Sequence, residues 1–357
     1  MATPRIEKLR KELVRKEVDA IFISQPDDRF YLSGFTGSAG YLLITQDKAI
    51  IATDFRYVEQ VKMQSPDFTL FQITGRAAEW FPRFIDPVEM LRLGFEAGDV
   101  TFAFYRDLNQ ILDKFRPRLH LVPLEGVVEG LRAVKDPEEI ALIQHAADIG
   151  DKAFNSVTAR LKPGVTEKEV AWKLEKAMRE ADSQSIPFEV IVAAGKNSAM
   201  PHARPSDRPI AEGEPVVIDM GARYKGYASD LTRTICLGKP DAMFKKIYGI
   251  VQQAQEAAIN GIVDGMTGMQ ADALARNVIT NAGYGEMFGH SLGHGVGISV
   301  HDPLPYLSRL SNEPLHNGMV FSIEPGIYLP EWCGVRIEDL AVMENGKVKL
   351  LSHAKKL

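Results

Sequence analysis

Four acidic residues stand in short apolar runs typical of β-strands, in the C-terminal half of the sequence. Asp219 and Asp230 close a strand–turn–strand segment, and Glu324 and Glu338 each sit in an apolar, strand-like run. An acid at an inward-facing strand position is costly unless it is paired or coordinates a cation. Each of these residues alone, or His294 alone, is more often a turn cap or a solvated polar group. The set of four carboxylates and one imidazole instead predicts a site for two divalent cations.

The spacing of the first two acids fits a β-hairpin. With a turn centred between Tyr224 and Lys225, Asp219 and Asp230 are directly opposite, since 224 − 219 and 230 − 225 both equal 5. With a turn centred on Lys225 and Gly226 they become diagonal neighbours. Both registers place the two carboxylates on one face, with Cβ atoms roughly 4.5–8 Å apart. Two carboxylates at that distance repel each other unless a proton or a cation lies between them.

The predicted donor set also restricts the metal. Oxygen ligands with a single imidazole favour Mn²⁺ first, with Co²⁺, Zn²⁺ or Fe²⁺ as alternatives, over a thiolate-type structural zinc site. Two dications balance the charge of four carboxylates, so the nearly neutral cluster can hold a bridging hydroxide as the nucleophile.

Composition narrows the class of protein. The formal net charge of −5 and the charged fraction of 25% describe an ordinary globular chain without a nucleic-acid footprint. Cys236 and Cys333 are too few for a disulfide framework. Residues 1–12 are charged rather than apolar, and no run is long enough to span a membrane, so we expect a cytoplasmic protein without membrane or nucleic-acid partners.

The chain is long enough for two domains. Residues 5–17 predict an amphipathic helix, and runs at 20–23, 41–44 and 49–52 predict strands. With helices near 55–63 and 101–115, this alternation predicts an α/β domain. The boundary should fall near 125–135, giving domains 1–127 and 128–357.

A long helix should open the second domain. Asp136 provides an N-cap, Pro137 the first helical position, and two acids follow in the first turn, so the helix should extend to about Arg160.

The second domain shows signs of internal duplication. Thr166 with Glu169 and Thr267 with Gln270 form two capping boxes separated by 101 residues (267 − 166). A glycine precedes both Asp219 and Glu324 by six positions (219 − 213 and 324 − 318). We expect each half to contribute two acids to the site, around a pseudo-two-fold axis. Chance is the alternative, because such turns and caps are common.

Five short blocks resemble the pita-bread metallopeptidase family, which includes methionine aminopeptidase, aminopeptidase P and prolidase. They are Ile-Asp-Met-Gly at 218–221, Ser-Asp-Leu-Thr-Arg-Thr at 229–234, Gly-His-Gly-Val-Gly at 293–297, Ser-Ile-Glu-Pro-Gly at 322–326 and Arg-Ile-Glu-Asp at 336–339. Segments 35–40 and 53–60 resemble the N-terminal domain of the aminopeptidase P and prolidase branch. The resemblance implies a creatinase/prolidase-like α/β domain followed by an α+β pita-bread catalytic domain.

The resemblance also implies roles for individual residues. Asp230 and Glu338 would bridge two metal ions, Asp219 would complete one, and His294 with Glu324 would complete the other. Glu324 would also shuttle a proton.

Further polar residues match other family positions. His202, His290 and His301 would donate hydrogen bonds to the scissile carbonyl and the developing oxyanion. Arg336, two residues before Glu338 and so expected on the same strand face, would orient carboxylates or bind substrate. The sequence departs from the family at Asp302, where glutamate is usual; this puts substrate preference in doubt more than catalysis.

The implied activity is cleavage of Xaa-Pro bonds. Such a bond is a tertiary amide with no N–H, which excludes peptidases that rely on that group. We expect an Xaa-Pro aminopeptidase of the aminopeptidase P type acting on proline-containing peptides, with an Xaa-Pro dipeptidase (prolidase) as the alternative. A non-catalytic binding module and a metal-free hydrolase related to creatinase are disfavoured, because all five ligands are present. The resemblance further implies a homodimer in which the N-terminal domain limits substrate length.

Replacement of Asp230 or Glu338 by Ala should abolish hydrolysis, because each change removes a ligand that both metals share. The measurement is Xaa-Pro peptide turnover by metal-stripped and reloaded protein. Full turnover by the stripped protein would contradict the prediction.

Overall fold

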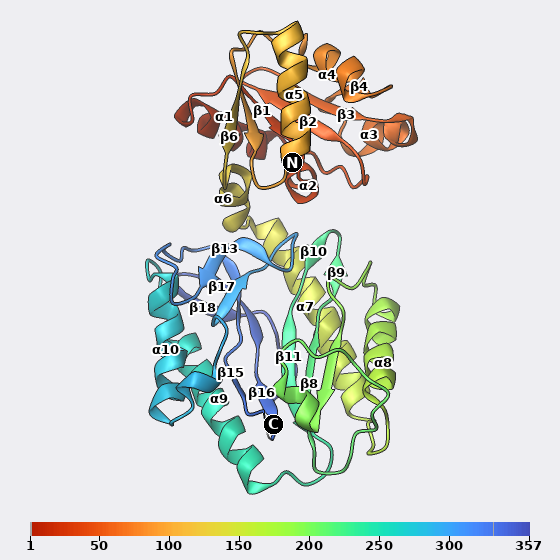
Figure 1. Ribbon diagram of the computed structural model, residues 1–357. Helices are drawn as coiled ribbons and strands as arrows, with labels where there is room; N and C mark the ends of the chain where they lie inside the picture. The colour runs from red at the N-terminus through yellow and green to blue at the C-terminus, as the bar shows by residue number, and fades with distance from the viewer. Residues whose placement is uncertain (1, 331) are drawn as a thin grey trace. The chain divides into compact units, whose positions relative to one another are not determined.

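The computed structural model describes residues 2–330 and 332–357 and divides the chain into two compact units, Met1–Arg132 and Ala133–Leu357 (Figure 1). The first unit is α/β and the second is α+β, which confirms the predicted fold class. The expected functional division at 127/128 stays a prediction. Among the described residues, no helix combines the length and apolar character that a membrane crossing demands.

The first unit is built on a mixed six-stranded sheet in the order β4-β3-β2-β1-β5-β6. Its strands are β1 (Ala20–Ile23), β2 (Tyr41–Thr45), β3 (Ala49–Thr53), β4 (Thr69–Gln72), β5 (Arg92–Glu96) and β6 (His120–Leu124). Its helices are α1 (Ala2–Arg15), α2 (Pro26–Ser33), α3 (Val58–Gln64), α4 (Ala77–Ile85), α5 (Phe102–Phe115) and α6 (Val127–Ala133, which crosses the unit boundary), with a 3₁₀ turn, η1, at Phe55–Tyr57. The three strands expected from apolar runs are all present. The expected helix at 55–63 is split, because the Asp54 side chain caps the 3₁₀ turn at the Arg56 N–H.

A buried acid pair is formed by Asp28 of α2 and Glu96 of β5. Asp28 is fully buried and accepts a hydrogen bond from Arg132 Nη1 at 2.6 Å. Glu96, at the end of β5, accepts hydrogen bonds from the N–H groups of Ser24 (2.6 Å) and Gln25 (2.7 Å) through Oε2. Burial, followed by the charge of Asp28 and a hydrogen bond to it, raises the pKa of Glu96 to about 9. Glu96 is therefore neutral at pH 7 and shares its proton with Asp28.

The second unit has two halves, each with two long helices followed by strands, and the second half has β13 and β18 in addition. Its helices are α7 (Pro137–Thr158), α8 (Glu167–Glu180), α9 (Ala242–Gly261) and α10 (Gly268–Asn281), with 3₁₀ turns η2 (Gly195–Ala199) and η3 (Gly285–Met287). The strands of its first half are β7 (Ile191–Ala194), β8 (Pro215–Met220), β9 (Arg223–Tyr224), β10 (Tyr227–Ala228) and β11 (Leu231–Cys236). Those of the second half are β12 (Gly293–Gly295), β13 (Asp302–Leu307), β14 (Val320–Ile323), β15 (Gly326–Tyr328), β16 (Gly334–Arg336), β17 (Asp339–Glu344) and β18 (Lys347–Leu350).

The strand pairing supports the predicted duplication. Antiparallel β7-β8-β11 in the first half corresponds to β12-β14-β17 in the second, and a short hairpin (β9-β10 or β15-β16) is inserted before the last strand of each. Both predicted capping boxes are formed, and so is a third at Asp136 that opens α7. In Figure 1 α7 and α8 lie on one side of these strands and α9 and α10 on the other.

The hairpin register is the diagonal one. Thr232 pairs with Asp219, and Tyr227 pairs with Tyr224, so the turn is centred on Lys225 and Gly226. Both turn residues have positive φ (45° and 89°), as a two-residue type I′ turn requires. The alternative turn centre at Tyr224 is wrong.

Glu96→Gln should make the first unit less sensitive to alkaline pH. The pKa of Glu96 is raised on folding, so its contribution to stability is fully present below its unfolded pKa of about 4.5 and is lost as pH rises through about 9. Glutamine retains an oxygen for the two backbone N–H groups and can donate to Asp28. The unfolding free energy of Glu96→Gln should therefore increasingly exceed that of the wild type from pH 5 to pH 9, by roughly 1 kcal/mol or more at pH 9.

The measurement is denaturant unfolding followed by Trp80 fluorescence, in a background with Trp172 and Trp332 replaced by Phe. Exposed Glu125 is the control, and Glu125→Gln should leave the pH profile unchanged. An identical profile for Glu96→Gln and Glu125→Gln would contradict the shared-proton interpretation.

Candidate metal centre

All nine candidate residues line one cavity of about 1180 Å³ in the second unit. They are Asp219, Asp230, His294, Glu324 and Glu338, expected as ligands, and His202, His290, His301 and Arg336, expected around them. The two predicted halves therefore meet at a single site.

The acids lie mostly at strand ends rather than within strands. Only Asp219 is inside a strand, β8; Asp230 immediately precedes β11, Glu324 follows β14, and Glu338 precedes β17. The expectation that each acid sits within a strand is therefore wrong for three of them. At these three positions the backbone is no longer paired within a strand. The acidic side chains of both halves can therefore point toward one another.

His294 connects the two pairs of acids. Its Nε2 lies 3.6 Å from Asp230 Oδ2 and 3.4 Å from Glu324 Oε1. Asp230, His294 and Glu338 each offer a ligand atom, and these atoms all lie within 4.8 Å of one another. The Nδ1 of His294 is 3.0 Å from the Gly295 carbonyl, so a proton on Nδ1 leaves Nε2 free as a metal ligand.

Burial makes this cluster costly without a counter-charge. Burial first, and then the charge of Glu338, raises the pKa of Asp230 well above its ordinary value. Burial first, and then the charges of Glu324 and Asp219, does the same to the pKa of Glu338. Burial also raises the pKa of Glu324 and lowers that of His294. Bound cations would stabilise the ionised carboxylates and so lower their pKa values. They would also bind the imidazole in its neutral form.

Two buried carboxylate oxygens in the cluster have no hydrogen-bond partner among the described residues: Asp219 Oδ1 and Glu338 Oε1. Buried acceptors are normally satisfied, so orphaned oxygens in a cluster of acids indicate positions for an ion. The donor set and these two atoms fit divalent metal ions.

Arg336 and Thr232 hold the carboxylates in place. Arg336 Nη2 lies 2.7 Å from Asp219 Oδ2, and its Nε donates to Thr232 Oγ1 at 3.1 Å. The Thr232 hydroxyl in turn donates to Glu338 Oε2 at 2.7 Å. Arg336 ends β16, and Glu338 lies outside both β16 and β17, so the expected shared strand face is wrong. The two residues meet through Thr232 instead.

The three remaining histidines fall into two groups. His202 and His301 are exposed at the cavity, and the His301 ring lies 4.2 Å from that of His294. His290 has both nitrogens engaged: Nδ1 with the Ser291 carbonyl (2.8 Å) and Nε2 with the Tyr328 hydroxyl (2.9 Å).

Tyr328 links His290 to Arg336, whose Nη1 donates to the hydroxyl at 2.8 Å. Burial lowers the pKa of His290, and a neutral ring with its proton on Nδ1 accepts from Tyr328. A role for His290 as direct donor to substrate would require this bond to break. The substrate contact expected of His290 stays a prediction, and the geometry favours an action through Tyr328.

Asp302, the departure from the family pattern, is buried. Its Oδ2 lies 3.2 Å from Lys135 Nζ, and the Lys135 side chain is almost completely buried too. The residue is thus part of a buried ion pair next to His301.

The sequence patterns predicted no role for Thr232 or Tyr328. Thr232 lies inside the matched block 229–234, and Tyr328 follows the block 322–326 by two residues. Their position next to matched blocks is the one signal that pointed to them.

A family model described as metallopeptidase family M24 matches residues 141–345, the part that contains all nine site residues. The chain belongs to metallopeptidase family M24. A second model, described as the creatinase/prolidase N-terminal domain, matches residues 5–134. The resemblance seen in the five sequence blocks is confirmed. The protein is an enzyme, and its family implies divalent metal ions at the carboxylate cluster.

Solved structures of family members match nearly the whole chain. The Xaa-Pro dipeptidase from Bacillus anthracis is 39% identical with a TM-score of 0.95, covering 100% of this chain and 99% of that one. The X-Pro aminopeptidase from Thermotoga maritima is 34% identical with a TM-score of 0.89, covering 99% of both chains. Among curated relatives, the Xaa-Pro dipeptidase from Pyrococcus furiosus is 35% identical over 99% of both chains.

Thr232→Val should weaken metal binding by about 10- to 100-fold, because the hydroxyl that orients Glu338 is lost while the side-chain shape is retained. Isothermal titration of metal-stripped protein with Mn²⁺ measures the effect. Thr234→Val is the matched control: the Thr234 hydroxyl bonds the carbonyl and the N–H of Arg336 and makes no hydrogen bond to a carboxylate. Equal affinities for the two variants would show that Thr232 does not orient Glu338.

Proposed function

We propose that the protein is a metal-dependent Xaa-Pro dipeptidase that hydrolyses the bond before a C-terminal proline. The observation that carries the proposal is the convergence of four carboxylates and one imidazole on a single cavity, with two buried carboxylate oxygens left unpaired. The Bacillus and Pyrococcus relatives support a dipeptidase function better than the expected aminopeptidase P function. The similarity to the Thermotoga aminopeptidase leaves an Xaa-Pro aminopeptidase as the alternative function.

The proposed ligands are Asp219, Asp230, His294, Glu324 and Glu338, which would hold two divalent ions, Mn²⁺ being the first choice. Divalent ions at this position would activate a water molecule as nucleophile at neutral pH and polarise the scissile carbonyl. Every other task falls to the side chains of the cavity.

The exposed imidazoles of His202 and His301 are the groups available to contact the substrate carbonyl. An N–H of either would stabilise the negative charge that develops on that oxygen. Glu324, which is held by a hydrogen bond from Ser322 Oγ at 3.1 Å, is the candidate for carrying a proton to the prolyl nitrogen. That nitrogen carries no hydrogen in the intact bond, so protonation is needed before it can leave.

Arg309 is the proposed receptor for the carboxylate of a dipeptide. Four guanidinium groups line the cavity, and three are already paired: Arg336 with Asp219, Arg276 with Asp272, and Arg204 with Glu189 at 3.5 Å. Arg309 is exposed and makes no hydrogen bond or ion pair with any described residue. Guanidinium binds carboxylate through two parallel hydrogen bonds, so a free arginine at the cavity suits a substrate that ends at proline.

We still expect a homodimer with the N-terminal unit limiting substrate length, and a cytoplasmic location, and both stay predictions.

Arg309→Met should raise KM for an Xaa-Pro dipeptide at least tenfold, because a charge-assisted hydrogen bond contributes about 1.5–3 kcal/mol. Hydrolysis of the C-terminally amidated dipeptide should not change, since that substrate has no carboxylate. Arg204→Met removes an equal charge from the cavity and should leave KM near wild type. Steady-state kinetics on these substrates and on Xaa-Pro-Yaa make the comparison. Preference of the wild-type enzyme for Xaa-Pro-Yaa would favour the aminopeptidase alternative.

A further inference from the structure

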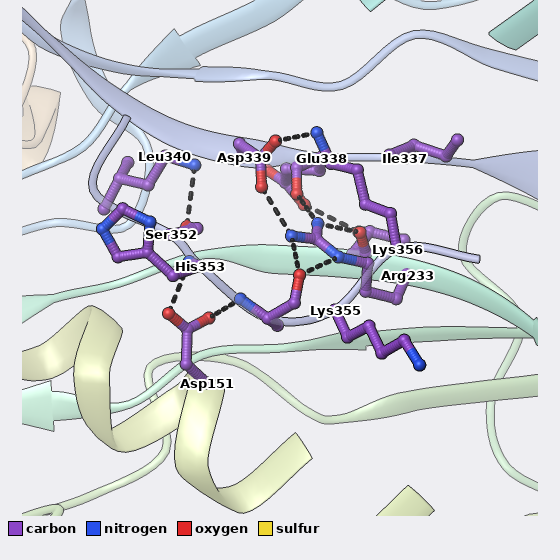
Figure 2. Close-up of polar contacts among 12 residues, drawn as sticks. Asp151, Arg233, Ile337, Glu338, Asp339, Leu340, Ser352, His353, Lys355 and Lys356 are labelled. Atoms are coloured by element: carbon purple, nitrogen blue, oxygen red, sulfur yellow. Dashed lines mark hydrogen bonds and ion pairs between the residues drawn. The ribbon is translucent and has the colours of Figure 1, made fainter. Parts of the chain in front are cut away.

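Residues of the segment 351–357 lie next to Asp151, Arg233 and Asp339 (Figure 2). The side chain of Asp151, on α7, accepts hydrogen bonds from the N–H groups of His353 (2.5 Å) and Ala354 (2.9 Å). These two contacts fix the backbone of a segment that has no regular secondary structure.

This segment completes a buried charge network around Asp339, the residue after Glu338. Arg233 is 1% exposed, and its Nη2 lies 2.6 Å from Asp339 Oδ1. The same guanidinium donates to the carbonyl of Glu338 and to that of Ala354. Lys356 Nζ lies 2.6 Å from Asp339 Oδ2, so each oxygen of Asp339 faces one cation (Figure 2).

Lys356 also binds a second residue, Gln255, which is fully buried on α9. Its Nζ donates to Gln255 Oε1 at 2.7 Å. The amide nitrogen of Gln255 donates to the carbonyls of Ile323 (3.1 Å) and Ile337 (3.2 Å). These are the residues immediately before the two glutamates of the metal centre. The buried Gln255 amide therefore connects the two backbone segments that carry Glu324 and Glu338.

The Lys356 contact favours the same orientation of that amide as the two carbonyls do. An amide side chain can present either its oxygen or its nitrogen to a partner. An ammonium group is a donor only, so it holds the oxygen toward itself and turns the nitrogen toward the two carbonyls.

We propose that Lys356 is a positioning residue of the metal centre, acting through Gln255 and Asp339 on the segments that carry Glu324 and Glu338. The inference rests on the proposed function in so far as these two glutamates are metal ligands. Segment 351–357 would then set the geometry of a metal site that the segment itself does not contact. Groups that orient metal ligands commonly change metal affinity 10- to 100-fold when removed.

The test compares two neighbouring lysines in the full-length protein. Lys356→Met keeps the length of the side chain and removes the ammonium. Lys355→Met is the matched control, because Lys355 is exposed and its side chain makes no hydrogen bond or ion pair with the described residues. Titration of metal-stripped protein with Mn²⁺ should show about tenfold weaker binding for Lys356→Met and wild-type binding for Lys355→Met.

Two additional variants separate positioning from general destabilisation. Lys356→Arg retains the charge and should recover most of the Mn²⁺ affinity. Thermal unfolding of the metal-free proteins checks that each variant is folded; should Lys356→Met not fold, Lys356→Gln, which removes the charge but retains an N–H donor, takes its place.

Wild-type affinity in a folded Lys356→Met variant (or Lys356→Gln variant) would overturn the inference. In that outcome, loss of Mn²⁺ binding by Asp230→Ala would still support the proposed function. No Mn²⁺ binding by the wild-type protein would overturn both. A visible-absorption band of the Co²⁺-loaded protein that shifts in Lys356→Met but not in Lys355→Met would support a change in ligand geometry.

Discussion

Repulsion among four carboxylates held in one cavity is the constraint on which the second unit depends. Asp230 and Glu338 are almost fully buried, and no arginine or lysine forms an ion pair with either carboxylate among the described residues. Among the described residues, the arginine that forms an ion pair with a ligand carboxylate is Arg336, which pairs with Asp219. A single positive charge does not balance four negative ones, so the cluster needs cations to be stable in its ionised form. The surrounding fold keeps the carboxylates together despite this cost.

The duplicated scaffold is what brings the acids together. In each half, three antiparallel strands carry one acid at the end of the middle strand and another immediately before the last strand. A short hairpin separates the two acids, β9-β10 in one half and β15-β16 in the other. The Glu338 N–H donates to the Thr232 carbonyl at 3.0 Å, which joins β11 of the first half to the residue immediately before β17 of the second. Neither half alone provides more than two of the carboxylates, so the site exists only when both are folded against each other.

Sequence reasoning succeeded where local rules determine the structure. Capping boxes, the proline at the start of α7 and the apolar strands depend on a few adjacent residues, and all formed as predicted. The hairpin spacing reduced the register to two choices, and the positive φ of Lys225 and Gly226 decided between them. The exact placement of the acids was wrong because strand ends depend on pairing with distant strands, which an apolar run does not reveal.

The supporting residues were missed for a different reason. Thr232 and Gln255 are ordinary polar residues whose partners lie 106 and 101 positions away in the sequence, at Glu338 and Lys356. Tyr328 contacts His290 across 38 positions. Such contacts follow from tertiary placement alone. Thr232 and Tyr328 at least lie in or near matched blocks, whereas Gln255 and Lys356 lack even that signal.

The hydrogen bonds of the ligand acids show how the protein prepares the site for metal. Glu338 accepts from Thr232 on Oε2 and leaves Oε1 unpaired; Asp219 accepts from Arg336 on Oδ2 and leaves Oδ1 unpaired. One oxygen of each carboxylate is thus held by the protein while the other remains available. Fixing a glutamate side chain costs up to about 2 kcal/mol of conformational entropy, and here folding meets that cost before any ion binds. The free oxygens are consequently presented in a set arrangement, and ion binding needs little further ordering of the side chains that receive it.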